Sequence, residues 1–261
     1  MPEGDTLFRT AAGLRPYLVG REVLAARAQG PGAVPQVQRV VGKRVDAVEA
    51  QGKNLLIRFD GGLELRTHLR MHGSWHRYRP GERWRRPPGR ARLVLEVDGA
   101  VAVCFDAPVV ELFESRAERV HPTLSTLGPD LLKPDFDAAE AHRRLRAPER
   151  RAMAISAALL DQRAMAGLGN IWRNETLFAE RVGPFARVAD LDDATLDGLI
   201  ATGRRLLTTS AGVAPGRAPT RVYRRTGRPC PRCGTAIRSM PLGGDVPRTT
   251  YWCPSCQAGT P

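Results

Sequence analysis

The stretch LLIRFDGGLEL, residues 55–65, decides the fold of the first half of the chain. Apolar side chains stand at every second position on both sides of its Asp60-Gly61-Gly62 segment. This period of two is typical of a strand with one buried face, and a short glycine-containing break between two such runs indicates a hairpin. The stretch therefore predicts two antiparallel strands joined by a turn.

The same pattern continues along the chain on either side of this hairpin. Residues 93–97 and 101–105 alternate in the same way around Asp98-Gly99, a dipeptide typical of tight hairpin turns. We expect residues 23–113 to form an antiparallel β-sandwich or flattened barrel.

A helix is predicted beside these strands, because leucine and alanine recur at helical spacing over residues 6–19. Asp5 or Thr6 can cap its first turn, and Gly20 ends it. In the strand at 101–105, the single Cys104 is expected to face away from the residues that alternate inward around it. This interpretation makes Cys104 a weakly buried or surface thiol.

Residues 75–92 hold seven arginines, two tryptophans and three prolines, and predict a long loop between strands. Arginines with interleaved aromatic residues can follow a nucleic-acid backbone and stack on its bases. A solvated loop is the alternative.

The second half of the chain changes to helical spacing. Residues 118–135 contain three prolines and follow neither period, which favours a linker between domains. Helices are predicted over 137–146 and 150–161, and a further helix carries the leucines and isoleucine of residues 196–207. Between them, GLGNIWRNE at residues 167–175 predicts a glycine turn that leads into a helix.

Four cysteines close to the end of the sequence form two C-x2-C pairs. Residues 234–252 separate the pairs, and this spacing matches two knuckles that close one tetrahedral zinc site. Because protein would fill all four positions, the metal is expected to be structural. A redox dithiol or a pair of disulfides is the alternative that this spacing disfavours. The ligands are Cys230, Cys233, Cys253 and Cys256.

Together these patterns predict an α+β chain. An antiparallel β-sandwich with a flanking helix occupies residues 1–117, and a linker follows at 118–135. A helical domain is expected at 136–215, and a four-cysteine zinc finger on a β-hairpin at 216–261.

The charge of the chain points to a polyanionic partner. It has 40 lysines and arginines against 27 acidic residues, a net charge of +13, and nucleic acid is the simplest partner. Codon composition can contribute, because three of the 40 basic residues are lysine and 40 − 3 = 37 are arginine. No apolar run reaches the roughly 18 residues of a membrane span, and there is no signal-peptide pattern. We expect a soluble, cytoplasmic protein without a membrane partner.

The first residues, Met1-Pro2-Glu3, suit Schiff-base chemistry once Met1 is removed. An α-amino group has a pKa of about 8, so roughly a tenth of a free prolyl amine is nucleophilic at neutral pH. Its iminium with an aldehyde has no N–H to lose, and the fixed charge draws electrons during an elimination. Glu3 would handle the protons. The alternative is that Pro2 only favours removal of Met1 and Glu3 is a first-turn helix charge.

Three separate positions suit contacts with phosphate. Lys53 lies at a predicted turn, Asn170 begins a predicted helix, and Arg248 lies on the arm between the cysteine pairs. Backbone N–H groups at a helix start and a guanidinium fork both bind phosphate. A solvated lysine, a helix cap and an ordinary arginine are the respective alternatives.

Residues 68–73 follow a predicted strand, and here Arg70, Met71 and His72 are expected to project into DNA. Ordinary surface residues are the alternative. Three histidines lie at 68, 72 and 76, but their spacing does not converge on a metal in a strand-and-loop context.

Five motifs in order resemble the formamidopyrimidine-DNA glycosylase and endonuclease VIII family over essentially the whole chain. They are Pro2-Glu3-Gly4, the Gln51-Gly52-Lys53 turn, the linker from His121-Pro122 to Leu127-Gly128-Pro129, the Gly167-Leu168-Gly169-Asn170 turn, and the four cysteines.

The resemblance implies a bifunctional enzyme that flips a damaged base out of DNA and attacks C1′ with Pro2. Strand cleavage would follow by β,δ-elimination, with Glu3 as general acid and base and Lys53 as a phosphate contact in the same catalytic set. Asn170 and Arg248 would bind phosphate from the helix-two-turns-helix domain and the zinc finger. Glu175 matches a carboxylate that the family keeps, and its role stays open.

The resemblance further implies a monomer that holds one structural Zn²⁺, needs no small-molecule cofactor and acts on damaged duplex or single-stranded DNA. It also implies a cytoplasmic, nucleoid-associated protein of bacterial type. Gly4 favours the endonuclease VIII branch, and residues 106–111 lack the Arg and Phe that the other branch inserts opposite the lesion. The Arg-rich region before Cys230 is also short for that branch's lesion-capping loop. Oxidised pyrimidines are therefore the expected substrates.

The chain departs from the family pattern at three places, one of which is a zinc loop a few residues longer than usual. Asp5-Thr6 replaces the usual Pro-Glu, so Asp5 is the candidate substitute for a supporting carboxylate. The wedge of Arg70, Met71 and His72 differs from the Gln-Leu-Tyr usual in endonuclease VIII, which leaves the opposite-base preference open. Two other functions remain as alternatives: a non-catalytic binder of damaged or single-stranded DNA, and an N-terminal-proline enzyme for a small carbonyl compound.

Overall fold

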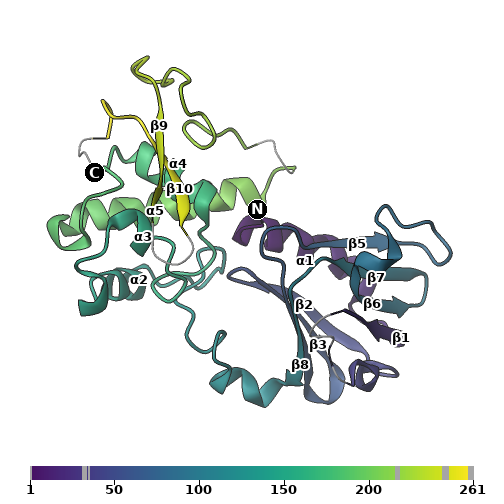
Figure 1. Cartoon of the computed structure of the whole chain (residues 1–261). Helices are drawn as coiled ribbons and strands as arrows, with labels where there is room; N and C mark the ends of the chain where they lie inside the picture. The colour runs from purple at the N-terminus through teal and green to yellow at the C-terminus, as the bar shows by residue number, and fades with distance from the viewer. Residues whose placement is uncertain (1, 31–33, 35, 215–217, 243–246, 258–261) are drawn as a thin grey trace. The chain divides into compact units, whose positions relative to one another are not determined.

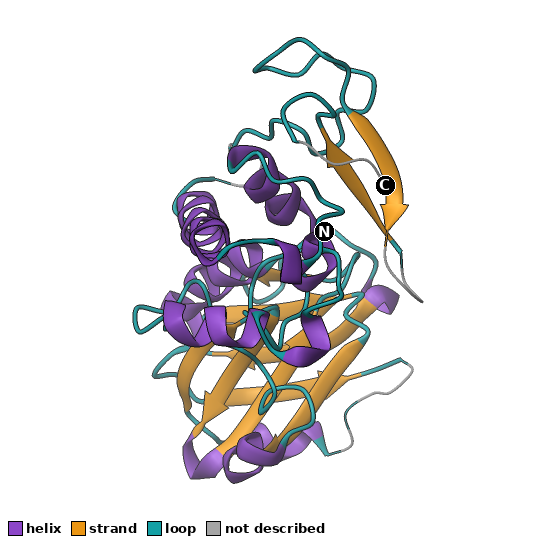
Figure 2. Ribbon diagram, turned by 90° about the vertical axis from the view of Figure 1, so that its left-hand side faces the viewer, coloured by secondary structure: helices purple, strands orange, loops and turns teal. Residues whose placement is uncertain are grey.

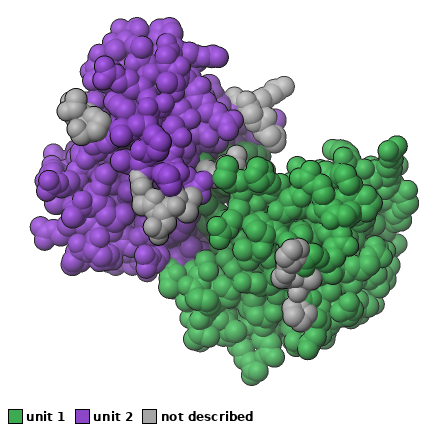
Figure 3. All heavy atoms as spheres, viewed as in Figure 1, with its two compact units in different colours: residues 1–126 green, residues 127–261 purple. Residues whose placement is uncertain are grey.

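The computed structural model describes residues 2–30, 34, 36–214, 218–242 and 247–257. The expected removal of Met1 lies outside the described residues. The chain divides into two compact units, residues 1–126 and 127–261 (Figure 3). The division falls inside the predicted linker, and the finer four-part division stays a prediction.

The first unit contains two four-stranded antiparallel sheets, which confirms the predicted sandwich (Figures 1 and 2). One sheet has the order β1-β6-β7-β5, and the other has the order β2-β3-β4-β8. The strands are β1 (Val23–Ala28), β2 (Val45–Gln51), β3 (Asn54–Phe59), β4 (Leu63–His68), β5 (Ser74–Tyr78), β6 (Ala91–Val97), β7 (Ala100–Phe105) and β8 (Val109–Glu114). The 3-10 turns of this unit are η1 (Val37–Val40), η2 (Asp60–Gly62), η3 (Pro88–Arg90) and η4 (Ser115–Val120).

Both predicted hairpins are present. β3 pairs with β4 around η2, and β6 pairs with β7 around Asp98-Gly99. Gly61 has φ +71° and Gly99 has φ +71°, a left-handed conformation that glycine adopts without steric cost. The turn chemistry therefore sets the register that directs Ile57 and Leu65 into the same core.

Helix α1 (Gly4–Leu18) packs on this core through one apolar face. Leu7, Leu14 and Leu18 are buried at helical spacing. The helix starts two residues before the predicted position, and its N-cap is Glu3 rather than Asp5 or Thr6. Glu3 caps with its backbone, because its carbonyl accepts hydrogen bonds from the amides of Thr6 and Leu7.

The prediction for Cys104 is wrong. Its side chain is fully buried in the core between the sheets together with Ala102, while Val103 and Phe105 face outward. The outward face of β7 is also covered, because the ring of Trp84 lies against Phe105 with ring centroids 5.8 Å apart. The alternation was therefore correct, but the larger side chains mark the outer face. Burial raises the pKa of the Cys104 thiol.

The outer face of the second sheet is covered as well, so β3 is buried on both faces. Here Arg58 on β3 bridges Glu64 on β4, at 2.9 Å, and Glu118 in η4, at 3.0 Å. On the same sheet the ring of His121 contacts Phe113 on β8, with centroids 5.1 Å apart. These contacts fasten residues 115–121, where the predicted linker begins, to the sheet.

The second unit contains helices and a two-stranded hairpin (Figure 1). Its elements are α2 (Ala138–Leu145), η5 (Pro148–Arg150), α3 (Ile155–Ala158), α4 (Asn170–Ala179), η6 (Val188–Asp190), α5 (Asp193–Ala211), β9 (Arg238–Leu242) and β10 (Arg248–Trp252). No helix among the described residues is long and apolar enough to cross a membrane.

The helix predicted over 150–161 is too long, because only α3 is α-helical there. The amide of Val188 donates to the carbonyl of Met153, and the amide of Ile155 donates to that of Ala186. Residues 153–155 are thus hydrogen-bonded to a distant segment before α3 begins. This tertiary pairing overrides the local helical spacing.

The buried Glu64 predicts a pH-dependent stability. Burial raises the pKa of Glu64 from 4.5 to about 7, although Arg58 opposes the shift. Because the folded pKa is the higher one, this group stabilises the fold fully below pH 4.5, and the contribution is lost as the pH rises through about 7. The Glu64→Gln variant, which cannot ionise, should therefore gain melting temperature relative to the natural chain between pH 5 and pH 8.

Thermal unfolding followed by circular dichroism at several pH values tests this expectation, with Glu22→Gln at an exposed position as the control. The melting temperature of Glu22→Gln should differ from that of the natural chain by the same amount at every pH. A Glu64→Gln difference that is also flat with pH would show that the carboxyl titrates at its ordinary value.

Candidate functional site

The start of α1 places a buried carboxylate beside Pro2. Glu3 is 1% exposed, and Pro2 is half-buried directly before it. Asp5 follows on the first turn, and its carboxylate is 3.1 Å from the guanidinium of Arg9. Asp5 is therefore held within its own helix by an i,i+4 ion pair, while Glu3 stands at the positive end of the helix dipole.

Lys53 lies in a two-residue turn between β2 and β3, with Gly52 at φ +58°. The side chain of Asn54 stiffens this turn: its amide donates to the carbonyl of Gln51 at 3.0 Å, and its oxygen accepts from Arg66 at 2.9 Å. α1 packs against both β2 and β3. The turn therefore connects two strands that support the N-terminal helix, and a phosphate contact by Lys53 stays a prediction.

Residues 70–72, in the turn from β4 to β5, are exposed, which fits both the predicted DNA contact and the alternative of ordinary surface residues. Met71 is 54% exposed, and Arg70 has φ +45°, an uncommon conformation for a residue with a side chain. The amide of Arg70 donates to Nδ1 of His68 at 3.2 Å. Burial, together with the charges of Arg66, Arg70 and Lys53, lowers the pKa of His68 to about 4. His68 is therefore neutral at pH 7 and acts as an acceptor that shapes the loop.

The tryptophans of residues 75–92 do not lie open for stacking on bases, so that part of the sequence interpretation is wrong. Trp75 is buried in the core, where its indole N–H donates to Thr67 at 3.0 Å. Trp84 stacks on Tyr78 with ring centroids 6.0 Å apart. The segment also begins as strand β5 rather than as a loop. Its aromatic residues fix the backbone of residues 79–90.

In the second unit, α4 begins at Asn170, directly after the turn of residues 167–169. Gly167 has φ +101°, which requires a glycine there. Gly169 is the N-cap, so Asn170 stands inside the first turn and is not the cap. Its side-chain amide donates to the carbonyl of Thr249 at 3.1 Å. The contact brings Asn170 next to the residue that follows Arg248 on β10.

Two further residues of α4 hold the same hairpin. The side-chain oxygen of Asn174 accepts from the amide of Tyr251 at 2.9 Å, and Arg173 donates to the hydroxyl of Thr250 at 2.8 Å. Both side chains are almost fully buried. Both contacts join residues 77 positions apart, so no local pattern in the sequence indicates them.

Glu175, whose role the sequence left open, binds a loop. Its two oxygens accept hydrogen bonds from the amides of Arg221, Val222 and Tyr223 at 2.7, 3.0 and 2.9 Å. Burial raises the pKa of Glu175, although these three amides favour the ionised form. Glu175 therefore anchors the chain that leads from α5 to the cysteine finger.

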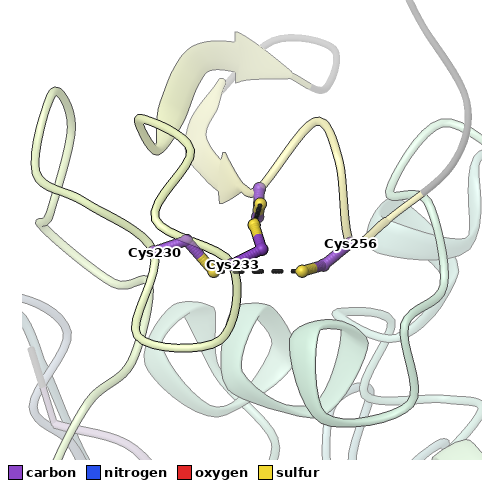
Figure 4. Close-up of side chains that lie close together, drawn as sticks. Cys230, Cys233 and Cys256 are labelled. Atoms are coloured by element: carbon purple, nitrogen blue, oxygen red, sulfur yellow. Dashed lines mark hydrogen bonds between the residues drawn. The ribbon is translucent and has the colours of Figure 1, made fainter.

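The four cysteine sulfurs converge at the base of the β9–β10 hairpin, as Figure 4 shows for Cys230, Cys233 and Cys256. All four sulfurs lie within 4.8 Å of one another. The sulfurs of Cys230 and Cys256 are 3.9 Å apart, and those of Cys233 and Cys253 are 3.5 Å apart. A tetrahedron with Zn–S bonds of about 2.3 Å has sulfurs about 3.8 Å apart. The four thiols therefore fit a metal ion.

Comparisons with known proteins agree with these geometries. Residues 1–108 match the formamidopyrimidine-DNA glycosylase N-terminal domain, and residues 127–219 match the formamidopyrimidine-DNA glycosylase H2TH domain. A probable endonuclease 8 2 of Streptomyces coelicolor is 38% identical, over 99% of this chain and 95% of the relative. The chain belongs to the formamidopyrimidine-DNA glycosylase and endonuclease VIII family. The match confirms the family predicted from the five motifs.

Other members of the family extend the comparison. A DNA-(apurinic or apyrimidinic site) lyase Nei2 of Mycolicibacterium smegmatis is 38% identical over the full length of both chains. Among solved structures, MutM of Thermus thermophilus is 28% identical and has a TM-score of 0.84, with both chains covered completely. The Lactococcus lactis enzyme bound to AP-site DNA has a TM-score of 0.86 at 23% identity, over 98% of this chain and all of the other, and supports the fold alone.

The contacts of α4 predict that Asn174 controls the hairpin. In Asn174→Ala, the amide of Tyr251 loses its buried acceptor, which should cost about 1–3 kcal/mol in unfolding free energy. Hydrogen–deuterium exchange of residues 248–252 should accelerate by about tenfold. Thr208→Ala, an exposed change on α5, should do neither. Unchanged exchange in Asn174→Ala would mean that other contacts hold the hairpin.

Proposed function

We propose that the chain is a bifunctional DNA glycosylase and AP lyase of base-excision repair. The observation that carries the proposal is the Pro2-Glu3 pair at the start of α1, where a buried carboxylate lies beside the residue that supplies a secondary amine. The lyase named among the relatives supports the same activity. A non-catalytic DNA binder would have no use for this pair.

In this mechanism the amine of Pro2 attacks C1′ of the damaged nucleotide. A bond forms between the nitrogen and C1′, the N-glycosidic bond breaks, and the departing base takes a proton. Opening of the sugar ring then gives a cationic iminium. Loss of a proton from C2′ expels the 3′ phosphate, a second elimination expels the 5′ phosphate, and water releases Pro2. Glu3 donates and accepts the protons at the sugar.

DNA binding is proposed for residues on separate, internally stiffened elements. Lys53 at the β2–β3 turn joins the catalytic set as a phosphate contact, while Asn170 and Arg248 bind phosphate where α4 meets β10. Arg70, Met71 and His72 form a wedge that enters the DNA beside the flipped base. Oxidised pyrimidines are the proposed substrates, in duplex or single strands, with the chain acting as a monomer without a small-molecule cofactor.

One structural Zn²⁺ is proposed for the four cysteines. The donor set leaves no open position for a reactant, so the ion would clamp the hairpin that carries Arg248. The finger docks on α4 at both ends, because Arg232 also donates to the carbonyl of Phe178 at 3.0 Å. The metal and α4 would thus both fix the position of Arg248.

A trapping experiment tests the chemistry. Borohydride should reduce the iminium formed by Met1-free protein with an oxidised-pyrimidine oligonucleotide, and mass spectrometry should place the adduct on Pro2. Protein with an uncleaved N-terminal extension has an amide at Pro2 and should give no adduct. Glu3→Gln should release base at least about 100-fold more slowly, whereas Glu22→Gln should match the natural chain. An adduct on a lysine would contradict the proposed nucleophile.

Metal analysis tests the finger. The purified chain should contain one zinc per molecule, and Cys233→Ser should lose it together with DNA affinity, since Arg248 would no longer be held. Cys104→Ala should keep the full zinc content, because that thiol lies in the other unit. Equal zinc content in Cys233→Ser and Cys104→Ala would show that the four cysteines are not the site.

A further inference from the structure

The loop between β5 and β6, residues 79–90, carries Arg86, whose guanidinium contacts His72 in the wedge of residues 70–72. Nη1 of Arg86 donates to the carbonyl of His72 at 3.3 Å and also to the carboxylate of Asp106. Arg86 thus joins three separate segments: its own loop, the wedge after β4, and the turn between β7 and β8. No local pattern of the sequence places these segments together.

Contacts before and after Arg86 in the sequence hold the backbone of its loop in place. Before it, Trp84 stacks on Tyr78, and the amide of Arg85 donates to the Tyr78 hydroxyl at 3.0 Å. After it, Arg90 donates through Nε to Asp106 at 2.8 Å. Because the backbone is ordered before any ligand arrives, a contact by Arg86 would require little further loss of conformational entropy.

The charges around Arg86 are not balanced. One carboxylate, that of Asp106, faces two guanidiniums, those of Arg86 and Arg90. The hydrogen bonds and charges of these arginines lower the pKa of Asp106 despite its partial burial, so it stays ionised. The pair of arginines still leaves an excess of positive charge beside the wedge. The side chain of Arg86 is 31% exposed, and only its Nη1 is hydrogen-bonded among the described residues.

We propose that Arg86 is a further residue of the wedge and donates hydrogen bonds to the strand opposite the damaged nucleotide. Its acceptor is an oxygen or nitrogen of that strand, either a phosphate oxygen or the O6 and N7 edge of a purine. Asp106 and the His72 carbonyl act as positioning groups that aim the guanidinium. The proposal rests on the proposed function, because it assigns a side of the DNA to the wedge.

The composition of the turn between β7 and β8 supports this role of Arg86 as a hydrogen-bond donor. Residues 106–108 read Asp-Ala-Pro and offer no donor side chain, and Asp106 instead binds the arginines of another loop. Asp106 has φ +53°, which an aspartate tolerates better than most residues. The turn therefore serves as an acceptor that fixes Arg86.

The test compares duplex with single-stranded substrate. A 5-hydroxyuracil oligonucleotide is cleaved alone, paired with G, or paired with A, by the natural chain, Arg86→Ala, Arg86→Lys and the exposed control Arg83→Ala. Arg86→Ala should lose about tenfold or more in kcat/KM on duplex and nothing on the single strand. Arg86→Lys should recover only part of the loss, because a lysine lacks the guanidinium fork. Arg83→Ala should match the natural chain on all three substrates.

The pairing distinguishes the two acceptors. A loss that is larger opposite G than opposite A identifies the purine edge, and an equal loss with a shallower salt dependence identifies a phosphate. The proposal is overturned if Arg86→Ala matches the natural chain on duplex, or if it loses equally on duplex and single strand, as a folding defect would. If the natural chain cleaves none of the substrates, the proposed function fails instead.

Discussion

The polar, buried face of α4 is the constraint on which the second unit depends. Asn170, Asn174 and Glu175 each bind backbone groups of segments that regular structure alone does not hold. A buried amide that lost its acceptor would cost about 1–3 kcal/mol, and several such contacts lie side by side on this helix. The cysteine finger also packs apolar side chains against α4, where Phe178 shares one buried cluster with Val222 and Ile237. The hydrogen bonds therefore fix the position of a contact that apolar burial also stabilises.

In the first unit, loops are held in place by segments that cover the outer faces of the two sheets. The loops for which DNA contacts are proposed leave the ends of strands, and the rigidity of such a loop depends on contacts beyond the strand. The outer faces of both sheets are therefore covered, one by Trp84 and its loop and the other by η4 through Arg58 and Glu118. These covers stiffen the supports of residues 70–72 and the start of the linker, while the central core fixes the sandwich.

Patterns that are local in sequence predicted the structure well. The four cysteines, the glycine turn before Asn170 and the hairpin glycines were identified because spacing and backbone conformation determine them directly. The orientation of β7 was not predicted correctly. Both of its faces are buried, and a period of two does not indicate which face lies toward the core. Cys104 was misplaced for that reason. The roles of Glu175 and Arg86 depend on partners at a distance in sequence, which no motif records.

The proposed reaction depends on the reactivity of one amine and on the positions of several DNA contacts, and these two requirements differ in how much structure they need. A prolyl amine is already partly nucleophilic at neutral pH, so Pro2 as the proposed nucleophile would need little help from its surroundings beyond a nearby carboxylate. The proposed phosphate and base contacts would need much more support, because a misplacement of about 1 Å can reduce the rate by a factor of about 100. Long-range hydrogen bonds accordingly support two of the proposed contact positions, because Asn170 donates to the carbonyl of Thr249 and Arg86 donates to that of His72.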